Sequence, residues 1–354
     1  MGYIGNKENL IDVIYQIMQK KGISGESFFD VFSGTANVAK YFKKLNYKVI
    51  SCDLMYYSYV LQKAYLENNT EPTFEKLSDI IDTLKHQDFF STPLQLILSY
   101  LNNIKDKNGF IYKNYTPGGS KELEQPRMYF TDKNGKFIDK VRVKIEDWYN
   151  NNLLTEQEYF ILIASLIETV SFYANISGVY AAFHKTWDRR ALKSMYLREP
   201  EIIKNSHINK CYQNNSLYLL DEVKADIFYL DPPYNQRQYA PNYHLLETIA
   251  KYDSPEIRGV SGMRDYSEQK SSFCNEKTAL EDLEKIVVNG KYKHLLLSYN
   301  NEGIMSNEKI LEVLKSNNNH VEIYDFDYLR FKSNNNGLSS HKKYVKEKLY
   351  IVSK

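Results

Sequence analysis

Cysteine is scarce in this sequence, with three residues among 354. Cys52, Cys211 and Cys274 lie far apart, form no C-x-x-C pair and have no histidine at metal-ligand spacing. This pattern argues against a disulfide framework and against a structural zinc site. We expect three reduced, mostly structural thiols and no bound metal.

Long hydrophobic runs are also lacking. The longest, such as residues 159–164 and 295–297, fall far below the ~20 residues that cross a bilayer. The N-terminus has no apolar stretch of the kind found in signal peptides. We therefore expect a cytoplasmic protein with no membrane partner. With 43% hydrophobic and 25% charged residues, the chain has a soluble globular composition and enough apolar material for a large core.

Neither sign of charge dominates, since 46 Lys and Arg face 44 Asp and Glu. This balance neither requires nor excludes nucleic acid, because binding depends on where charge clusters. Two segments are basic: residues 183–210 carry seven cations against three anions, and residues 330–348 carry six against one. A charge run usually marks a solvated face, so these segments become informative only beside a catalytic motif.

The two outer parts of the chain have an alternating strand and helix pattern. Apolar spacing predicts a helix over residues 10–18, ended by Gly22, and then a strand, a helix and a strand over residues 27–32, 36–45 and 48–52. Further strands are predicted at residues 227–230, 294–298, 320–326 and 348–352, and further helices at residues 243–251, 277–288 and 307–314. This pattern is typical of an α/β domain, which we assign to residues 1–66 and 153–354.

Residues 67–152 differ from these outer parts and are predicted to be an insertion. Helices are expected at residues 74–84 and 94–103, and a loop is expected at residues 116–119. A β-hairpin is expected around Asn134-Gly135, flanked by residues 128–130 and 137–138. A strong helix over residues 156–172 follows the insertion.

The first predicted strand leads into Asp30-Val31-Phe32-Ser33-Gly34-Thr35-Ala36. A glycine at the first strand-to-helix turn of an α/β sheet lets a ligand approach the backbone closely. Asp53 ends the next strand, where a carboxylate can accept hydrogen bonds from ribose hydroxyls. Alone, this pair is a weak indication of a cofactor site.

The most informative segment is Asp231-Pro232-Pro233-Tyr234, which follows the apolar residues 227–230. An aromatic amine is a poor nucleophile while its lone pair is delocalised. The Asp231 carboxylate and the Pro232 carbonyl are placed to accept hydrogen bonds from such an amine and to free the lone pair, while the two prolines keep the loop rigid. Stacking of a base on Tyr234 is worth ~1 to 3 kcal/mol, comparable with the few kcal/mol needed to extract a base from a duplex.

With these motifs, the chain resembles alpha-class, Dam-like DNA adenine amino-methyltransferases that use S-adenosylmethionine. Tyr3-Ile4-Gly5-Asn6-Lys7 is similar to the family's N-terminal motif, and residues 30–36 and 231–234 are similar to its cofactor and catalytic loops. The resemblance implies a Rossmann-like methyltransferase sheet with an inserted, mainly helical target-recognition region. It implies catalytic roles for Asp231, Pro232, Pro233 and Tyr234. It places the cofactor at Tyr3, Lys7, Asp30, Phe32, Ser33, Gly34, Thr35 and Asp53.

The chain departs from the family pattern at two places. The second glycine of the cofactor loop is Ala36, so a Cβ must be tolerated there. The acid that often contacts the cofactor's adenine is replaced by Asn214-Asn215-Ser216, and Asn215 is the candidate for that contact.

DNA contacts are expected in the first basic segment. Residues 175–180 resemble the loop that borders the target pocket, which makes Tyr180 a candidate, and Lys185, Arg189, Arg190, Lys193 and Arg237 are candidate DNA contacts. Residues 258–273 are a further candidate loop. The histidines, His244 included, and both tryptophans are expected in packing or hydrogen-bonding roles.

Three functional hypotheses follow. The leading one is methyl transfer to a flipped adenine in double-stranded DNA, by the modification enzyme of a restriction-modification system with a restriction endonuclease as a candidate partner. A second is methylation of RNA or of protein glutamine, although family members acting on glutamine usually have Asn in place of Asp231. A third is a DNA-binding regulator that has lost catalysis. The sequence leaves the recognition site and the oligomeric state open.

Overall fold

The computed structural model describes residues 10–85, 91–316, 320–329 and 344–354. It separates into two compact units. We call residues 63–203 and 241–266 the helical unit, and the remaining described residues, within 10–62, 204–240 and 267–354, the sheet unit. Among the described residues, no helix is long and apolar enough to cross a membrane.

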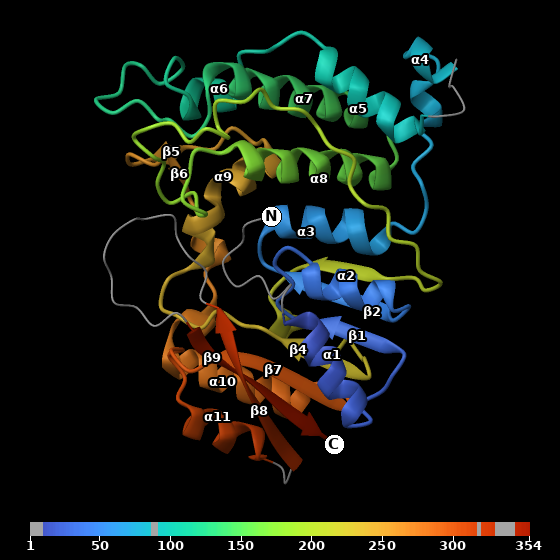
Figure 1. Cartoon of the computed structure of the whole chain (residues 1–354), viewed down its shortest axis with the longest axis vertical. Coiled ribbons are helices and arrows are strands. Elements are labelled where there is room, and N and C mark those ends of the chain that lie inside the picture. The colour runs from blue at the N-terminus through green and yellow to red at the C-terminus, as the bar shows by residue number, and fades with distance from the viewer. Residues whose placement is uncertain (1–9, 86–90, 317–319, 330–343) are drawn as a thin grey trace. The chain divides into compact units, whose positions relative to one another are not determined.

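The sheet unit contains a seven-stranded sheet in the order β3-β2-β1-β4-β7-β9-β8 (Figure 1). Strands β3, β2, β1, β4 and β7 are parallel, whereas β9 is antiparallel to both β7 and β8. The strands are β1 Ser27–Asp30, β2 Lys48–Asp53, β3 Lys210–Gln213, β4 Ile227–Leu230, β7 His294–Asn300, β8 His320–Leu329 and β9 Tyr344–Ser353. The predicted α/β class, with a mainly parallel central sheet, is confirmed.

Helices alternate with the strands of this sheet. They are α1 Ile11–Lys20, α2 Asn37–Lys44, α3 Tyr56–Gln62, α10 Glu276–Asn289 and α11 Asn307–Leu314. All of them except α3 were predicted from the apolar spacing, and β3 is the strand that the prediction missed. Side chains of β4 are buried throughout, which explains why its sequence is a continuous apolar run rather than an alternating one.

The carboxyl ends of the parallel strands meet at one edge of the sheet. In the strand register, Asp30 pairs with Ser51 on one side and Tyr229 on the other, and Asp53 pairs with Gln213. The loops that follow β1, β2, β3 and β4 therefore start side by side at this edge, where ligands of open α/β sheets bind.

The helical unit is built mainly from helices and one short hairpin (Figure 1). Helix α7 contacts α5, α6 and α8. The helices are α4 Asp82–Lys85, α5 Pro93–Asn103, α6 Phe110–Tyr115, α7 Asp132–Asn150, α8 Glu156–Tyr173 and, from Pro241 onward, α9 Tyr239–Lys251. The hairpin consists of β5 Ile257–Arg258 and β6 Met263–Arg264.

The predicted β-hairpin around Asn134-Gly135 is wrong, because these residues form the first turn of α7. The Thr131 hydroxyl caps the helix by accepting from the Asn134 backbone N–H at 3.2 Å. Gly135 is required for close packing rather than for a turn, since a Cβ there would lie 2.3 Å from Thr116 Cγ2. Glycine thus marks a helix contact at this position.

The predicted helix over residues 74–84 is also largely wrong. Phe74 adopts a left-handed backbone, with φ 51°, and only a short 3₁₀ turn, Glu75–Leu77, and α4 form in this segment. The Phe74 N–H donates to the Glu158 carboxylate of α8 at 2.5 Å. This long-range bond and the burial of Phe74 override the local helical pattern. The predicted loop at residues 116–119 and the helices matching α5 and α8 are confirmed.

Residues 241–266 are held to the insertion by buried polar contacts. The Arg142 guanidinium donates to the carbonyls of Ile249 and Ala250, at 3.1 Å each, at the end of α9. The Tyr252 hydroxyl donates to Asp139 at 2.7 Å. The predicted insertion, residues 67–152, thus lies in one compact unit with a segment that follows the D-P-P-Y motif. Its assignment to target recognition remains a prediction.

Candidate active site

The turn after β1 is clamped to the end of β2. Gly34 has φ 51°, and its N–H donates to Asp53 Oδ2 at 2.8 Å. The Met55 N–H donates to Asp53 Oδ1 at 2.8 Å. Both oxygens of Asp53 thus fix the turn after β1 to the end of β2.

A buried polar chain that the sequence reasoning missed supports the same turn. Ser51 donates to Gln62 at 2.6 Å, Gln62 donates to Ser58 at 2.9 Å, and Ser58 donates to the Gly34 carbonyl. The available signal was the pair of polar residues Ser58 and Gln62, which are spaced i, i+4 among apolar positions of α3.

Ala36 occupies the place of the second glycine in the family pattern. It is fully buried and left-handed, with φ 59°, a conformation that costs a non-glycine residue about 1 kcal/mol. The Cβ is therefore accommodated at this position, at a cost in backbone strain. Among its neighbours, Ser33 and Thr35 are buried, and Phe32 packs edge-on against Phe273, with ring centroids 4.9 Å apart.

Asp30 is a buried carboxyl group at the end of β1, with 1% of its surface exposed. Ser33 donates to Oδ2 at 3.1 Å, whereas Oδ1 has no hydrogen-bond partner among the described residues. Burial raises the pKa of Asp30 to about 7; the Ser33 hydrogen bond opposes this shift, and the negative charge of Asp231 adds to it. This site fits a bound cation that would provide the missing partner.

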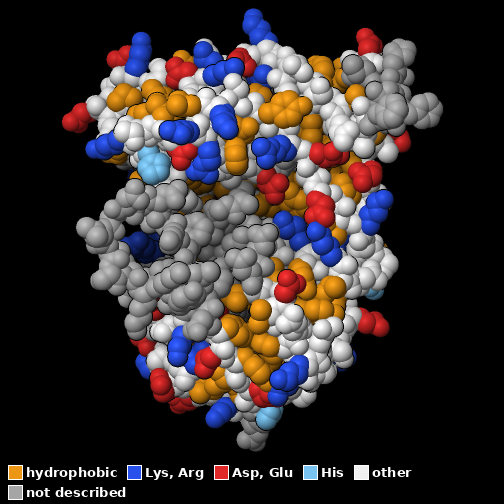
Figure 2. Space-filling view, viewed as in Figure 1, with side chains coloured by type: hydrophobic (Ala, Val, Ile, Leu, Met, Phe, Trp, Pro, Cys, Tyr) orange, Lys and Arg blue, Asp and Glu red, His pale blue; other side chains and the backbone are white. Residues whose placement is uncertain are grey.

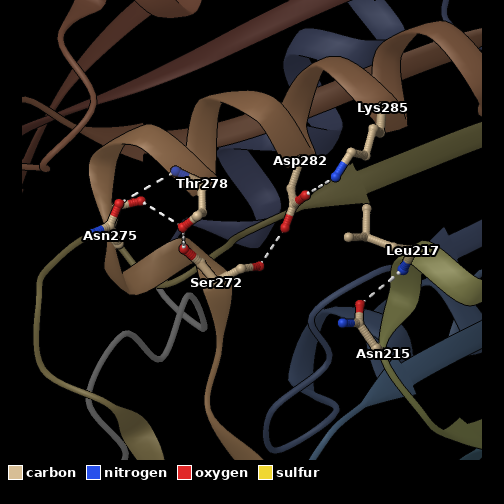
Figure 3. Close-up of polar contacts among 7 residues, drawn as sticks. All are labelled: Asn215, Leu217, Ser272, Asn275, Thr278, Asp282 and Lys285. Atoms are coloured by element: carbon tan, nitrogen blue, oxygen red, sulfur yellow. Dashed lines mark hydrogen bonds and ion pairs between the residues drawn. The ribbon is translucent and has the colours of Figure 1, made fainter.

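Asn215 follows β3 at the same edge. Its side-chain oxygen accepts from the Leu217 N–H at 3.1 Å and caps a 3₁₀ turn, Ser216–Leu219 (Figure 3). The neighbouring Asn214 N–H donates to the Asp53 carbonyl at 3.1 Å. The structure thus brings Asn215 near the Gly34 turn, and its contact with a cofactor remains a prediction.

The D-P-P-Y loop leaves β4 at this edge. The Val31 N–H donates to the Tyr229 carbonyl at 3.0 Å, which keeps β1 and β4 in register up to the loop. Asp231 is half-buried and Pro232 is buried. The Tyr234 carbonyl accepts from the Ile304 N–H at 2.9 Å, and its ring packs against the core of the sheet unit.

Residues 271–275 join the two loops; the sequence placed residues 258–273 in a candidate DNA loop and did not predict this contact with the Gly34 turn. The Gln238 side chain donates to the Ser271 carbonyl at 3.0 Å and accepts from the Ser271 N–H at 2.7 Å. Phe273 contacts Phe32 of the cofactor turn. At the start of α10, Asn275 caps the helix by accepting from the N–H groups of Lys277 and Thr278. Figure 3 shows its contact with Thr278 and the hydrogen bond that Ser272 donates to Asp282. These bonds hold the residues after D-P-P-Y against the cofactor turn.

In the helical unit, Tyr180 is buried, with 2% of its surface exposed. Its carbonyl accepts from the Tyr129 hydroxyl at 2.7 Å and lies 2.9 Å from His244 Nε2. Burial lowers the pKa of His244 to about 4, so the ring is neutral near pH 7 and serves as a donor to this carbonyl. Tyr180 is therefore a packing residue in this structure, and contact of its ring with DNA would require a local opening.

The predicted phosphate contacts are exposed. Lys185, Arg189, Lys193 and Arg237 are open to solvent, while Arg190 forms an ion pair with Asp188 at 3.3 Å. Residues 185–193, which we call the basic loop, are held by Asn134 of α7, which donates to the carbonyls of Ala191 and Lys193. Figure 2 shows Lys and Arg side chains interspersed with hydrophobic and acidic ones on the visible face. The predicted residues Tyr3 and Lys7 lie outside the described residues.

A family model for D12 class N6 adenine-specific DNA methyltransferases matches residues 3–321, and the chain belongs to this family. It is 40% identical over 339 residues to the type II methyltransferase M.FokI of Planomicrobium okeanokoites, covering 94% of this chain and 50% of that protein. It is 38% identical to the modification methylase StsI of Streptococcus sanguinis, covering 100% of this chain and 52% of that protein.

A third relative differs in length. The chain is 34% identical to the type II methyltransferase M.NlaIII of Neisseria lactamica, covering 97% of this chain and 96% of that protein. The chain therefore spans about half the length of the first two relatives and nearly all of the third. The predicted family is confirmed.

Proposed function

We propose that this chain transfers a methyl group from S-adenosylmethionine to the exocyclic amine of a flipped adenine in double-stranded DNA. The observation that carries the proposal is the convergence of two loops at one sheet edge. The Gly34 turn, clamped by Asp53, and the Asp231 loop leave neighbouring parts of the sheet. The family and the relatives' names as type II or modification methylases support a role in restriction-modification, with a cognate restriction endonuclease as candidate partner.

The described residues fit the cofactor. The unpartnered Oδ1 of Asp30 suits the protonated amine of its methionine end, and Asp53 suits the ribose hydroxyls. Ser33 and Thr35, together with the Gly34 backbone, form the turn between these two carboxyl groups. When bound, the cofactor supplies an electrophilic methyl group on a sulfonium, so the adenine nitrogen needs only a free lone pair and an acceptor for one proton.

The Asp231 loop can free the nitrogen lone pair and accept the proton. The Asp231 carboxylate and the Pro232 carbonyl each accept a hydrogen bond from the amine, which turns the nitrogen lone pair out of conjugation with the ring. Asp231 would accept the one proton that the amine releases when it takes the methyl group from the bound cofactor. Pro233 limits the motion of the loop, and Tyr234 stacks on the extracted base.

The helical unit is proposed to select the DNA site. Exposed cations at Lys185, Arg189 and Lys193 in this unit, and at Arg237 in the sheet unit, are suited to phosphates. Exchange of residues 67–152 and 177–198 for the equivalent segments of a related enzyme is expected to change which adenines are methylated. Unchanged methylation sites would refute this assignment.

The direct test combines the wild-type chain with labelled S-adenosylmethionine and duplex DNA, followed by digestion to nucleosides. The expected product is N6-methyladenine. Transfer to RNA alone would favour the RNA hypothesis. Cofactor-dependent DNA binding without any transfer would favour the inactive regulator.

A further inference from the structure

The helical unit contains an open cleft of about 900 Å³. Its lining is mostly apolar, with Met128, Trp187 and Val260 among the contributing side chains, and it includes the cations Arg127 and Lys185. The lining comes from three segments: the loop before α7, the basic loop and the tip of the β5–β6 hairpin. All three segments lie in regions that the sequence predicted to contact DNA, namely the insertion, the first basic segment and residues 258–273.

The hairpin tip is held rigidly at the rim of this cleft. Arg127 is buried, with 7% of its surface exposed, and donates to the carbonyls of Val260 at 2.9 Å and Gly259 at 3.0 Å. The Tyr115 hydroxyl donates to the Gly262 carbonyl at 2.7 Å. Gly259 and Gly262, with φ 69° and 66°, close the turn between the two strands.

Val260 nevertheless points its side chain to solvent, with 61% of its surface exposed. The hairpin tip that carries Val260 is held in place by hydrogen bonds from the buried side chains of Arg127 and Tyr115. Single exposed apolar side chains are common on protein surfaces, but one that is held in place at the rim of a cleft is suited to contact a ligand.

The charges of the cleft favour an anionic partner. Arg127 donates only to backbone carbonyls, including that of Asn114 at 3.0 Å, and no carboxylate in the described ranges forms an ion pair with it. Lys185 is exposed nearby, and Glu124 is the one acidic side chain among the lining residues described. A buried cation without a counter-charge is stabilised when a polyanion approaches.

We propose that this cleft receives duplex DNA and that Val260 contacts base edges, which makes it a specificity-determining residue for a base other than the target adenine. The inference rests on the proposed function and deepens it. Trp187 adds apolar surface to the same cleft, and Lys185 pairs with a phosphate of the same duplex. The C5-methyl of thymine is the apolar group that a valine reads in the major groove.

The test uses the full chain and a pool of duplexes with one fixed adenine flanked by randomised bases, and the position of each methylated adenine is mapped. Single-turnover methylation is measured for wild type, Val260→Ser and the control Ile208→Ser, a change at a side chain with 89% of its surface exposed in the sheet unit. Val260→Ser is expected to lose about tenfold of the preference at one or two positions, the size of a single base contact. Ile208→Ser is expected to keep the wild-type preference profile.

The outcomes separate the inference from the proposed function. Identical profiles for Val260→Ser and Ile208→Ser, with wild type active, would overturn the inference alone. No methylation of any duplex by wild type would overturn the proposed function.

The variant Lys185→Gln tests DNA binding at the same cleft independently. It is expected to reduce the slope of log affinity against log salt by about 0.9 without changing the preferred sequence. An unchanged slope would show that Lys185 makes no contact with a DNA phosphate.

Discussion

At the scale of single residues, three carboxyl groups at one sheet edge are placed in different environments. Asp53 accepts hydrogen bonds from two backbone N–H groups, Asp231 begins the D-P-P-Y loop, and Asp30 is buried with one oxygen unpartnered. The sequence predicted that all three belong to the site. It could not predict the raised pKa of Asp30, because that pKa depends on burial and on the charge of Asp231, which follows a different strand.

The raised pKa of Asp30 predicts a pH-dependent stability. An unfolded aspartate has a pKa of about 3.9, whereas the folded group titrates near 7. The free-energy cost of burying ionised Asp30 is absent below pH 4 and reaches its full value above pH 7. The free energy of unfolding of the wild type should therefore fall relative to that of Asp30→Asn as the pH rises. Chemical denaturation of both proteins without cofactor at pH 4.5, 6 and 8 measures this difference, and a constant difference would contradict the assignment.

The same group is expected to couple to the cofactor. Because a cationic amine favours ionised Asp30, S-adenosylmethionine should bind wild type more tightly as the pH rises from 5.5 to 7, below the range in which an α-amine loses its proton. Calorimetry across this range checks the prediction. Asp30→Asn should bind more weakly and with a flatter pH profile, and an equally steep profile would assign the pH dependence to another group.

Backbone strain at Ala36 gives a second prediction at this scale. Ala36→Gly relieves about 1 kcal/mol of left-handed strain, which offsets the 0.5–1 kcal/mol that glycine usually costs, so the free energy of unfolding should change little. Ala39→Gly is the matched control, since Ala39 is equally buried but lies inside α2, where glycine should cost about 1 kcal/mol. Equal losses in the two variants would contradict the strain at Ala36.

At the scale of elements, the contact of α6 and α7 shows why a local motif misled the sequence reasoning. Asn134-Gly135 is a hairpin signal in isolation, but Thr131 caps a helix there and Gly135 lets the two helices approach. Residues 137, 138, 141, 145 and 148 then repeat with helical spacing and are buried. The tertiary contact of Gly135 is not visible in the sequence alone.

Gly135→Ala tests this contact. The added Cβ would lie 2.3 Å from Thr116 Cγ2 and 3.2 Å from Tyr112 Cα, so overpacking should destabilise the chain by ~1–3 kcal/mol despite the better helix propensity of alanine. Thr116→Ser removes Cγ2 and keeps the hydroxyl that donates to the Tyr112 carbonyl. A double-mutant cycle of these changes, followed by denaturation, should show a coupling of about 1 kcal/mol, and additivity would contradict the close contact.

At the scale of the whole molecule, most strands and helices of the sheet unit were predictable because each is a local pattern bounded by turn residues. The D-P-P-Y loop and the Gly34 turn were predictable because their motifs are local too. The supporting contacts were not, since Gln238 bonds to Ser271 and Arg127 bonds to Val260 across long stretches of chain. The same limit explains why residues 241–266 were not assigned to the helical unit.

The proposed role of the Asp231 loop in methyl transfer can be tested by the single-turnover kinetics of two variants. Asp231→Ala should slow transfer by orders of magnitude, with cofactor affinity nearly unchanged, on duplexes with the target adenine matched or mismatched. Tyr234→Ala should also slow transfer, but less on the mismatched duplex, where extraction of the base costs less. Equal rescue of both variants by the mismatch, or normal transfer by Asp231→Ala, would contradict the roles assigned to the carboxylate and the ring.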